Sequence, residues 1–298
     1  MENFENVRVW RDVMVVVRDG IRLATDIYFP ANSTGPFPVL LERTPYNMRG
    51  TNHADRNAAD PTPKSKPAVA AEFARAGYVY VLQDCRGRYQ SEGGFEKYLN
   101  EGPDGADTIA WIMQQSWCAG KVGTLGLSYG AHVQTALAAF APPGLAAMFL
   151  DSGGFSSAFH SGIRQGGAFE LKQLTWAYKH ALLAPQTSAD PARRKALEAE
   201  DLRAWMRVQP WQSGASPLAA APEYEQYVVE QWSKELFGEY WCSPALFSRG
   251  HYESFPDVPM VHMSSWFDPY SLTATENYVG LARDRQGPVR LVLGPWTH

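Results

Sequence analysis

The chain has 298 residues, enough for one large α/β domain with an insertion or for two ordinary domains. Hydrophobic residues make up 45% and charged residues 19% of the sequence, a composition that excludes a disordered chain. The net charge of -4 comes without a basic block, so we expect no nucleic-acid partner.

The three cysteines, Cys85, Cys118 and Cys242, are odd in number and show no CxxC spacing. They predict neither a disulfide framework nor a zinc site, and a reducing compartment fits them best. The N-terminus has charges where a signal peptide needs an apolar core, and no apolar run approaches the length of a membrane span. We therefore expect a cytoplasmic protein without a metal, a cofactor or a membrane partner.

The N-terminal part of the chain predicts a β-hairpin. Residues 7–17 are rich in valine with polar residues between, and residues 21–29 form a second run of β type. Asp19 and Gly20 lie between the two runs, and Asp-Gly in this position is a strong hairpin signal.

Short apolar strands then alternate with helices. The predicted strands are residues 37–41, 78–82, 122–127 and 145–150, and the predicted helices are residues 68–76, 104–115 and 132–140. Residues 47–66 are interpreted as a long loop. Such alternation is typical of βαβ units in a mostly parallel sheet, with the hairpin at its antiparallel edge. Sheets of this kind place their ligand sites at the carboxyl ends of the strands.

Residues 155–250 differ in character, because they contain helix formers and no clear buried strand. They also hold five of the ten tryptophans, Trp176, Trp205, Trp211, Trp232 and Trp241. The strands resume at residues 259–264 and 289–293. We therefore predict a core of residues 1–154 and 251–298 and a helical cap insertion of residues 155–250, which would sit over the sheet.

The run from Gly126 to Gly130 matches G-x-S-x-G, the nucleophile elbow of α/β-hydrolases, with Ser128 at its centre. The motif alone is weak, but here an apolar strand precedes it and an alanine-rich helix follows, as the elbow requires. We therefore predict an α/β-hydrolase fold with Ser128 as a covalent nucleophile. The backbone N–H of Tyr129 would be one oxyanion donor, because the residue after the nucleophile serves that role on this fold.

A serine nucleophile needs a base and an orienting acid, which follow it on this fold in the order acid, histidine. His298 comes just past the last predicted strand, although a terminal residue can also be frayed and inert. The other six histidines are less well placed: His53, His132, His160, His180, His251 and His262. For the acid, Asp268 is favoured by its place after a strand, with Asp151 as the alternative.

Several motifs together resemble the X-Pro dipeptidyl-peptidase-like acyl hydrolases, the group that includes cocaine esterase, glutaryl acylases and α-amino-acid ester hydrolases. They are Arg18-Asp19-Gly20, Arg43-Thr44-Pro45-Tyr46, Gln83-Asp84-Cys85-Arg86-Gly87-Arg88, Trp266-Phe267-Asp268 and Gly294-Pro295-Trp296-Thr297-His298. One departure is Ala131, where the family usually has glycine. Asp84 and Arg86 are interpreted as a structural turn that braces nearby loops.

The resemblance implies Ser128 as nucleophile, Asp268 as acid and His298 as base, with the Tyr46 hydroxyl as a second oxyanion donor. It also implies a closing helix and then a β-rich jelly-roll domain after the histidine. This sequence contains neither, so the core is expected to be truncated at its C-terminal end.

The leading functional hypothesis is a serine hydrolase that cleaves an ester or amide through an acyl-enzyme. One alternative is an X-Pro dipeptidyl aminopeptidase, which needs a carboxylate for the substrate amine, with Glu170, Glu223 and Glu225 as candidates. The other is an inactive hydrolase fold used for binding. The expected partners are a small-molecule ester or amide and, as a further option, a second copy of the chain in a homo-oligomer.

Overall fold

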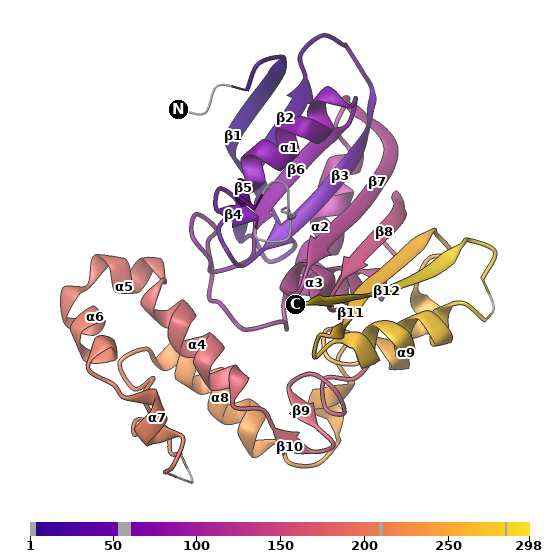
Figure 1. The fold of residues 1–298 in the computed structure, drawn as a ribbon. Coiled ribbons are helices and arrows are strands. Elements are labelled where there is room, and N and C mark those ends of the chain that lie inside the picture. The colour runs from indigo at the N-terminus through magenta and orange to yellow at the C-terminus, as the bar shows by residue number, and fades with distance from the viewer. Residues whose placement is uncertain (1–3, 53–60, 209–210, 284) are drawn as a thin grey trace.

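The computed structural model describes residues 4–52, 61–208, 211–283 and 285–298, and its centre is one eight-stranded sheet in the order β1-β2-β6-β3-β7-β8-β11-β12 (Figure 1). The strands are β1 Val7–Val16, β2 Arg22–Pro30, β3 Phe37–Thr44, β6 Val79–Asp84, β7 Cys118–Leu127, β8 Leu145–Asp151, β11 Met260–Phe267 and β12 Val289–Thr297. Strand β2 pairs antiparallel with β1 and β6, and the other pairs are parallel. The predicted mostly parallel sheet with an antiparallel hairpin at its edge is confirmed.

Four helices pack against this sheet: α1 Lys66–Arg75, α2 Glu101–Met113, α3 Tyr129–Ala138 and α9 Ser271–Leu281. Successive side chains of a strand point to opposite faces of a sheet. Tyr28 of β2 accordingly joins the cluster that contains Ala70 of α1. Its neighbour Ile27 joins the cluster that contains Ile109 of α2 and Leu137 of α3. Helix α1 therefore covers one face, while α2 and α3 cover the other.

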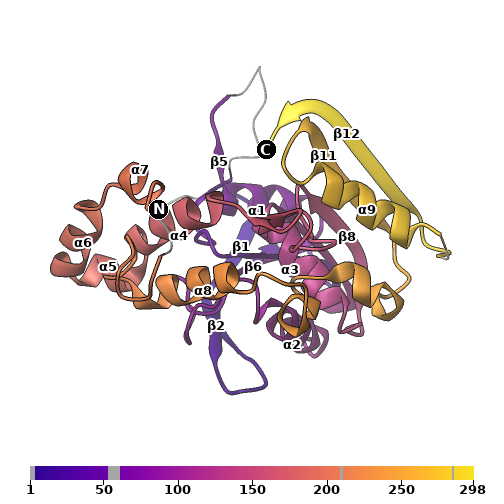
Figure 2. The ribbon, with the colours of Figure 1, turned by 90° about the horizontal axis from the view of Figure 1, so that it is seen from below.

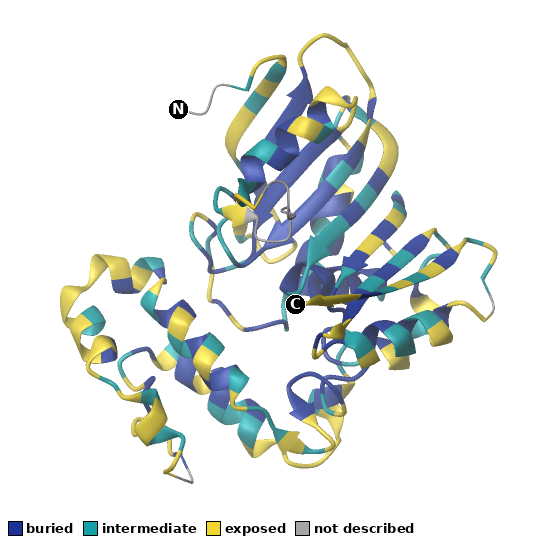
Figure 3. Cartoon of the chain, in the orientation of Figure 1, coloured by how far each residue is buried: buried dark blue, intermediate teal, exposed yellow. Residues whose placement is uncertain are grey.

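Both faces of the strands at the middle of the sheet are apolar, as expected for a parallel sheet with helices on each side. Figure 3 shows buried residues along β2, β6 and β3, and more exposed residues along β1 and β12 at the two edges. No described helix is long and apolar enough to cross a membrane.

The last strand is longer than the sequence predicts. Strand β12 was expected over residues 289–293 but continues to Thr297, because its register with β11 resumes after an irregularity and pairs Thr297 with Phe267. His298 therefore follows directly on the strand and does not lie in a loop beyond it. The long loop expected over residues 47–66 holds two short strands, β4 Thr51–Asn52 and β5 Lys64–Ser65; residues 53–60 lie outside the description.

The region between β8 and β11 is mainly helical, as its composition indicated. Its helices are α4 Lys172–Leu182, α5 Pro185–Ala189, α6 Pro191–Glu198, α7 Leu202–Trp205 and α8 Pro222–Ser233, followed by two 3-10 helices, Glu239–Cys242 and Ser248–Ser254. Two-residue strands β9 Arg164–Gln165 and β10 Ala168–Phe169 precede α4. Figures 1 and 2 show α4 to α8 grouped at one end of the molecule. The division into a core and a cap domain stays a prediction.

Candidate active site

Ser128 lies on the turn between β7 and α3. Its backbone has φ 59° and ψ -113°, a region that residues with a Cβ rarely adopt. Holding a residue in such a conformation costs about 1–3 kcal/mol and needs support from its surroundings. This conformation is the one that a nucleophile elbow requires, because it lifts the side chain clear of the strand.

Three glycines make room for this turn. A Cβ on Gly126 would lie 2.8 Å from the Cα atom of Gly130, so these two backbones can approach only without a side chain at residue 126. A Cβ on Gly153 would lie 2.4 Å from the carbonyl oxygen of Ser128. The same Cβ would lie 2.9 Å from the Cβ atom of Ala131, so a side chain at residue 131 fits because residue 153 is glycine.

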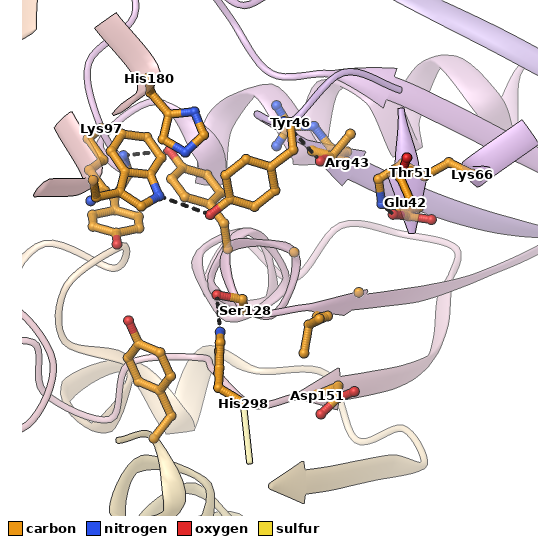
Figure 4. A pocket seen from close by; sticks show the side chains of 18 of the residues that line it. Glu42, Arg43, Tyr46, Thr51, Lys66, Lys97, Ser128, Asp151, His180 and His298 are labelled. Carbon is orange, nitrogen blue, oxygen red and sulfur yellow. Dashed lines mark hydrogen bonds and ion pairs between the residues drawn. The ribbon is translucent and has the colours of Figure 1, made fainter. Parts of the chain in front are cut away.

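Three residues predicted from distant parts of the chain form one line of hydrogen bonds. The Nε2 atom of His298 lies 3.0 Å from Oγ of Ser128, and its Nδ1 atom lies 2.7 Å from Oδ2 of Asp268. Figure 4 shows the imidazole of His298 directed at Ser128. The alternative acid, Asp151, accepts a hydrogen bond from its neighbour Ser152 at 2.9 Å.

The Asp268 carboxylate is fixed from two sides. Its side chain accepts hydrogen bonds from His298 and, through Oδ1, from the backbone N–H of Tyr270 at 2.6 Å. Burial acts to raise the pKa of Asp268. The hydrogen bonds from His298 and Tyr270, with attraction to His298 and a hydrogen bond from Ser152, together outweigh burial and hold the pKa below its ordinary value. The carboxylate is therefore ionised at neutral pH and can accept a hydrogen bond from the protonated Nδ1 of His298.

Tyr46 lies on a turn just after β3, at the carboxyl end of the sheet. Its backbone N–H donates to Oγ1 of Thr44 at 3.1 Å. The Arg88 guanidinium donates to the carbonyl oxygen of Pro45 at 3.0 Å. The backbone N–H of Met48 donates to Oδ1 of Asp84 at 2.7 Å. These contacts fix the direction in which the tyrosine ring leaves the backbone.

The Tyr46 hydroxyl lies between Ser128 and helix α4. It accepts a hydrogen bond from the Trp176 indole at 3.1 Å. Burial raises the pKa of Tyr46 to about 12, although hydrogen bonds with Trp176 and Ser128 act in the opposite direction. The phenol therefore keeps its proton at neutral pH and can donate it in a hydrogen bond.

Tyr129 opens helix α3, so its backbone N–H has no acceptor within the helix. Its side chain points elsewhere: the hydroxyl donates to Oε1 of Glu101 at 2.9 Å and accepts from the backbone N–H of Tyr98 at 2.8 Å. The backbone N–H of Tyr129, and not its side chain, is therefore available to donate to a substrate atom at Ser128.

Asp84 and Arg86 form a brace beside the site, as the sequence indicated. Asp84 holds the backbone of the Tyr46 turn through Met48. The guanidinium of Arg86 donates to Asp104 at 2.6 Å and to Asp19 at 2.6 Å, and so ties the turn after β6 to α2 and to the hairpin.

Replacing Asp84 with asparagine is expected to change how stability depends on pH. Burial raises the pKa of Asp84 to about 7, above its value in an unfolded chain. A raised carboxyl pKa means that the folded protein binds the proton more tightly than the unfolded chain does. The contribution of Asp84 to the free energy of unfolding therefore falls as pH rises from about 4 to about 7. The asparagine variant has no such carboxyl group, so this drop of roughly 2–4 kcal/mol should be absent from its free energy of unfolding. Its amide oxygen can still accept a hydrogen bond from the backbone N–H of Met48.

The measurement is urea unfolding of the parent and of Asp84→Asn at about pH 5 and about pH 8. The variant should gain stability relative to the parent at the higher pH. An equal difference between the two proteins at both pH values would contradict the assigned burial of this charge.

A cavity of about 830 Å³ opens at Ser128 and His298. Its walls come from the strand ends and from the first helix of the insertion. The α4 residues that line it are Lys172, Gln173, Thr175, Trp176, Lys179 and His180. Burial lowers the pKa of His180 to about 2, so this ring is neutral and packs against Tyr46 at 5.2 Å between ring centroids.

The remaining candidates lie away from Ser128 Oγ or have other partners. His132 is buried in α3, where Nδ1 accepts from the backbone N–H of Gly154, and His262 is buried within β11. His160 contacts Ser157 and His251 contacts the Cys242 carbonyl, while His53 lies outside the described residues. Within the described part of the chain, no three His, Cys, Asp or Glu residues are arranged to hold a metal ion.

The carboxylates weighed for an aminopeptidase are engaged elsewhere. Glu223 pairs with Arg193, Glu170 pairs with Lys172, and Glu225 accepts from the Ser216 hydroxyl and the Gly214 backbone. None of these three carboxylates is among the described residues that line the cavity.

A serine on a strand-to-helix turn, hydrogen-bonded to a histidine and through it to an aspartate at the carboxyl end of a mostly parallel sheet, defines the α/β-hydrolase class. Comparison with known families narrows this class. A sequence model of the X-Pro dipeptidyl-peptidase (S15) family matches residues 19–298, and the chain belongs to that family.

The chain is also similar to individual relatives. It is 30% identical to cocaine esterase of Rhodococcus sp. (strain MB1 Bresler) in an alignment that covers 98% of this chain and 49% of the esterase. The chain thus spans about half the length of this relative.

Two solved structures share the fold. An α-amino acid ester hydrolase matches with a TM-score of 0.68 at 21% identity, over 100% of this chain and 49% of its own. An aminopeptidase from a marine sediment Thaumarchaeota archaeon also matches with a TM-score of 0.68 at 21% identity, over 100% of this chain and 50% of its own. Because an ester hydrolase and an aminopeptidase match equally well, the fold does not distinguish these two activities.

Proposed function

We propose that the protein is a serine hydrolase that cleaves an ester or amide bond through an acyl-enzyme. The observation that carries this proposal is the line of hydrogen bonds from Asp268 through His298 to Ser128. The bond from Nδ1 to a carboxylate assigns the imidazole proton to Nδ1, which leaves the Nε2 lone pair facing the serine hydroxyl. That is the tautomer in which histidine can act as a general base.

In the proposed reaction, Oγ of Ser128 attacks the substrate carbonyl carbon while Nε2 of His298 takes the hydroxyl proton. The carbonyl oxygen becomes an oxyanion, which the Tyr46 hydroxyl and the Tyr129 backbone N–H stabilise. His298 then gives its proton to the leaving alcohol or amine as the tetrahedral intermediate collapses. Water repeats the sequence with the acyl-enzyme and releases the acid.

Replacing Tyr46 with phenylalanine is expected to lower kcat by about 10²- to 10³-fold, the usual effect of removing one oxyanion donor. The KM should change little, because the donor acts mainly on charge that develops in the transition state. The measurement is steady-state hydrolysis of a p-nitrophenyl ester.

Tyr178→Phe is the matched control for Tyr46→Phe. It also removes a phenol hydroxyl, one that donates to the carbonyl of Leu197 outside the cavity. A Tyr46→Phe variant as active as this control would remove Tyr46 from the oxyanion site.

Ester or simple amide cleavage is favoured over dipeptidyl-peptidase activity by the charges around the cavity. A substrate with a free α-amine needs a carboxylate. Of the acidic residues in the described lining, Glu42 is paired with Lys66, and Asp151 accepts a hydrogen bond from Ser152. The lining also includes Lys172 and Lys179, which would repel an ammonium group. The similarity to a cocaine esterase also favours ester cleavage. The test compares kcat/KM for a phenyl ester with that for a Gly-Pro anilide, and faster cleavage of the anilide would overturn this choice.

The hypothesis of an inactive binding protein is less well supported, because the nucleophile, base, acid and oxyanion donors all stand together. The cytoplasmic location, a homo-oligomer and a β-rich jelly-roll domain beyond the hydrolase core stay predictions. A relative about twice as long as this chain is consistent with a further domain in the family.

A further inference from the structure

The Tyr46 hydroxyl has a second neighbour besides Ser128, and this neighbour comes from the insertion. Nε1 of Trp176, on helix α4, donates to the Tyr46 oxygen at 3.1 Å. An indole N–H can only donate, whereas a phenol oxygen has one proton and two lone pairs. The tyrosine must therefore accept in this contact, so its own proton is directed away from Trp176 and is free to reach another acceptor.

The Trp176 ring is held in place by aromatic neighbours. Phe95 and Tyr129 stack on it at centroid distances of 6.0 Å and 6.2 Å. His180, one helical turn further along α4, lies 4.1 Å away and also contacts the Tyr46 ring. A ring packed in this way keeps its N–H pointing in one direction.

A buried lysine completes the support. The Nζ atom of Lys97 lies 3.7 Å from the Trp176 ring centroid and donates to Oε1 of Gln173 at 3.0 Å. Within the described ranges, no carboxylate lies within ion-pair distance of Lys97. Besides Trp176 and Gln173, its Nζ atom lies 5.0 Å from the ring centroid of Tyr98 and 5.9 Å from that of Tyr227. Because Gln173 and Trp176 belong to the same helix, Lys97 fastens α4 to the segment before α2.

We propose that Trp176 is a positioning residue for the oxyanion site: its indole N–H fixes the Tyr46 oxygen and turns the Tyr46 proton toward the carbonyl oxygen of a substrate at Ser128. Helix α4 would thereby complete a site whose reacting groups all lie on the hydrolase core. This inference rests on the proposed function and deepens it, because it gives the insertion a part in the chemical step as well as in forming the cavity wall.

A different role would be purely apolar, with the ring shaping the acyl pocket. The two roles separate in the variant Trp176→Phe, which keeps an aromatic ring and removes the N–H. A positioning role predicts a fall in kcat of about tenfold, the worth of one ordinary hydrogen bond, with KM changed less than about twofold. An apolar role predicts a change in KM with kcat preserved.

The decisive experiment is a double-mutant cycle measured with a p-nitrophenyl ester on the parent, Trp176→Phe, Tyr46→Phe and the double variant. Once the Tyr46 hydroxyl is absent, the indole N–H has no proton to direct, so Trp176→Phe should have no further effect on kcat. An equal fall in kcat in both backgrounds, or no fall in either, would overturn the inference.

Two controls keep the outcome interpretable. Trp205→Phe removes an indole N–H that donates to Glu200 elsewhere in the insertion, and it should leave kcat unchanged. Circular dichroism and thermal unfolding check that each variant is folded. The proposed function is tested separately by Ser128→Ala. If this variant still turns over the ester, both the serine mechanism and this inference fail. If Ser128→Ala is inactive but the effects of Trp176→Phe and Tyr46→Phe on kcat are independent, only this inference fails.

Discussion

Replacing Ser128 with alanine is expected to lower kcat for an activated aryl ester by about 10⁴- to 10⁶-fold, because no other group can form the acyl-enzyme. The residual activity should come from the oxyanion donors and from substrate binding. The fold should be retained, since the change removes one oxygen at the cavity surface. Hydrolysis of p-nitrophenyl acetate measures the effect over this whole range.

The control for Ser128→Ala is Ser233→Ala, which removes an exposed hydroxyl at the end of α8. This variant should match the parent in kcat and KM. Comparable activity of the Ser128 variant and this control would mean that the elbow is a structural turn with no nucleophile.

Asparagine at residue 268 is expected to lower kcat by about 10⁴-fold, the effect known for this change in serine hydrolases of the same chemistry. The carboxylate of Asp268 accepts a hydrogen bond from Nδ1 of His298, which keeps the imidazole proton on Nδ1. An amide at this position can donate its own N–H to Nδ1, which would shift the imidazole proton to Nε2. The histidine would then present a proton to Ser128 instead of a lone pair.

Asp151→Asn is the matched control, because Asp151 was the alternative acid and also lines the cavity. Its carboxylate accepts a hydrogen bond from Ser152 and none from His298, so we expect a change in kcat of less than about tenfold. A large loss of kcat in Asp151→Asn together with a small loss in Asp268→Asn would mean that Asp151 is the acid. The pH-rate profiles of both variants, measured with the same ester, extend the comparison beyond one condition.

The elbow and the sheet could be predicted from the sequence because their signals are local. The alternation of apolar runs with helix formers determines βα units, and G-x-S-x-G between a strand and a helix indicates the turn at Ser128. The glycines on both sides have a steric reason that the structure makes explicit, since a Cβ on Gly126 would meet Gly130.

Chain order favoured Asp268 but left His298 open, because nothing in a single histidine distinguishes a base from a frayed terminus. The family resemblance then implied Asp268 as acid and His298 as base. The extent of β12 was underestimated, because glycine and proline, here Gly294 and Pro295, have low strand propensity and commonly mark the end of a strand. Here parallel pairing with β11 outweighs that propensity and carries the strand to Thr297. The resulting geometry brings His298 to the serine without an intervening loop.

The contribution of the insertion could not be read from the sequence. Trp176 was one of several tryptophans in a helical region, and no pattern indicated that its N–H would meet Tyr46. Lys97, likewise, occurs in a loop before α2 and carries no motif. Such contacts depend on how α4 packs against the strand ends, which is a tertiary property. Tyr46 itself was singled out through the family resemblance.

The most direct test of the proposed mechanism is the site of covalent labelling by a fluorophosphonate. The reagent phosphonylates an activated serine and cannot be displaced by water at a useful rate, so it marks the nucleophile. The protein is treated with the probe, digested, and its peptides are analysed by mass spectrometry. We predict one labelled peptide, with the adduct on Ser128, and no labelling in Ser128→Ala. A labelled Ser128→Ala variant, or an adduct on another serine in the parent, would contradict the assignment of Ser128 as the nucleophile.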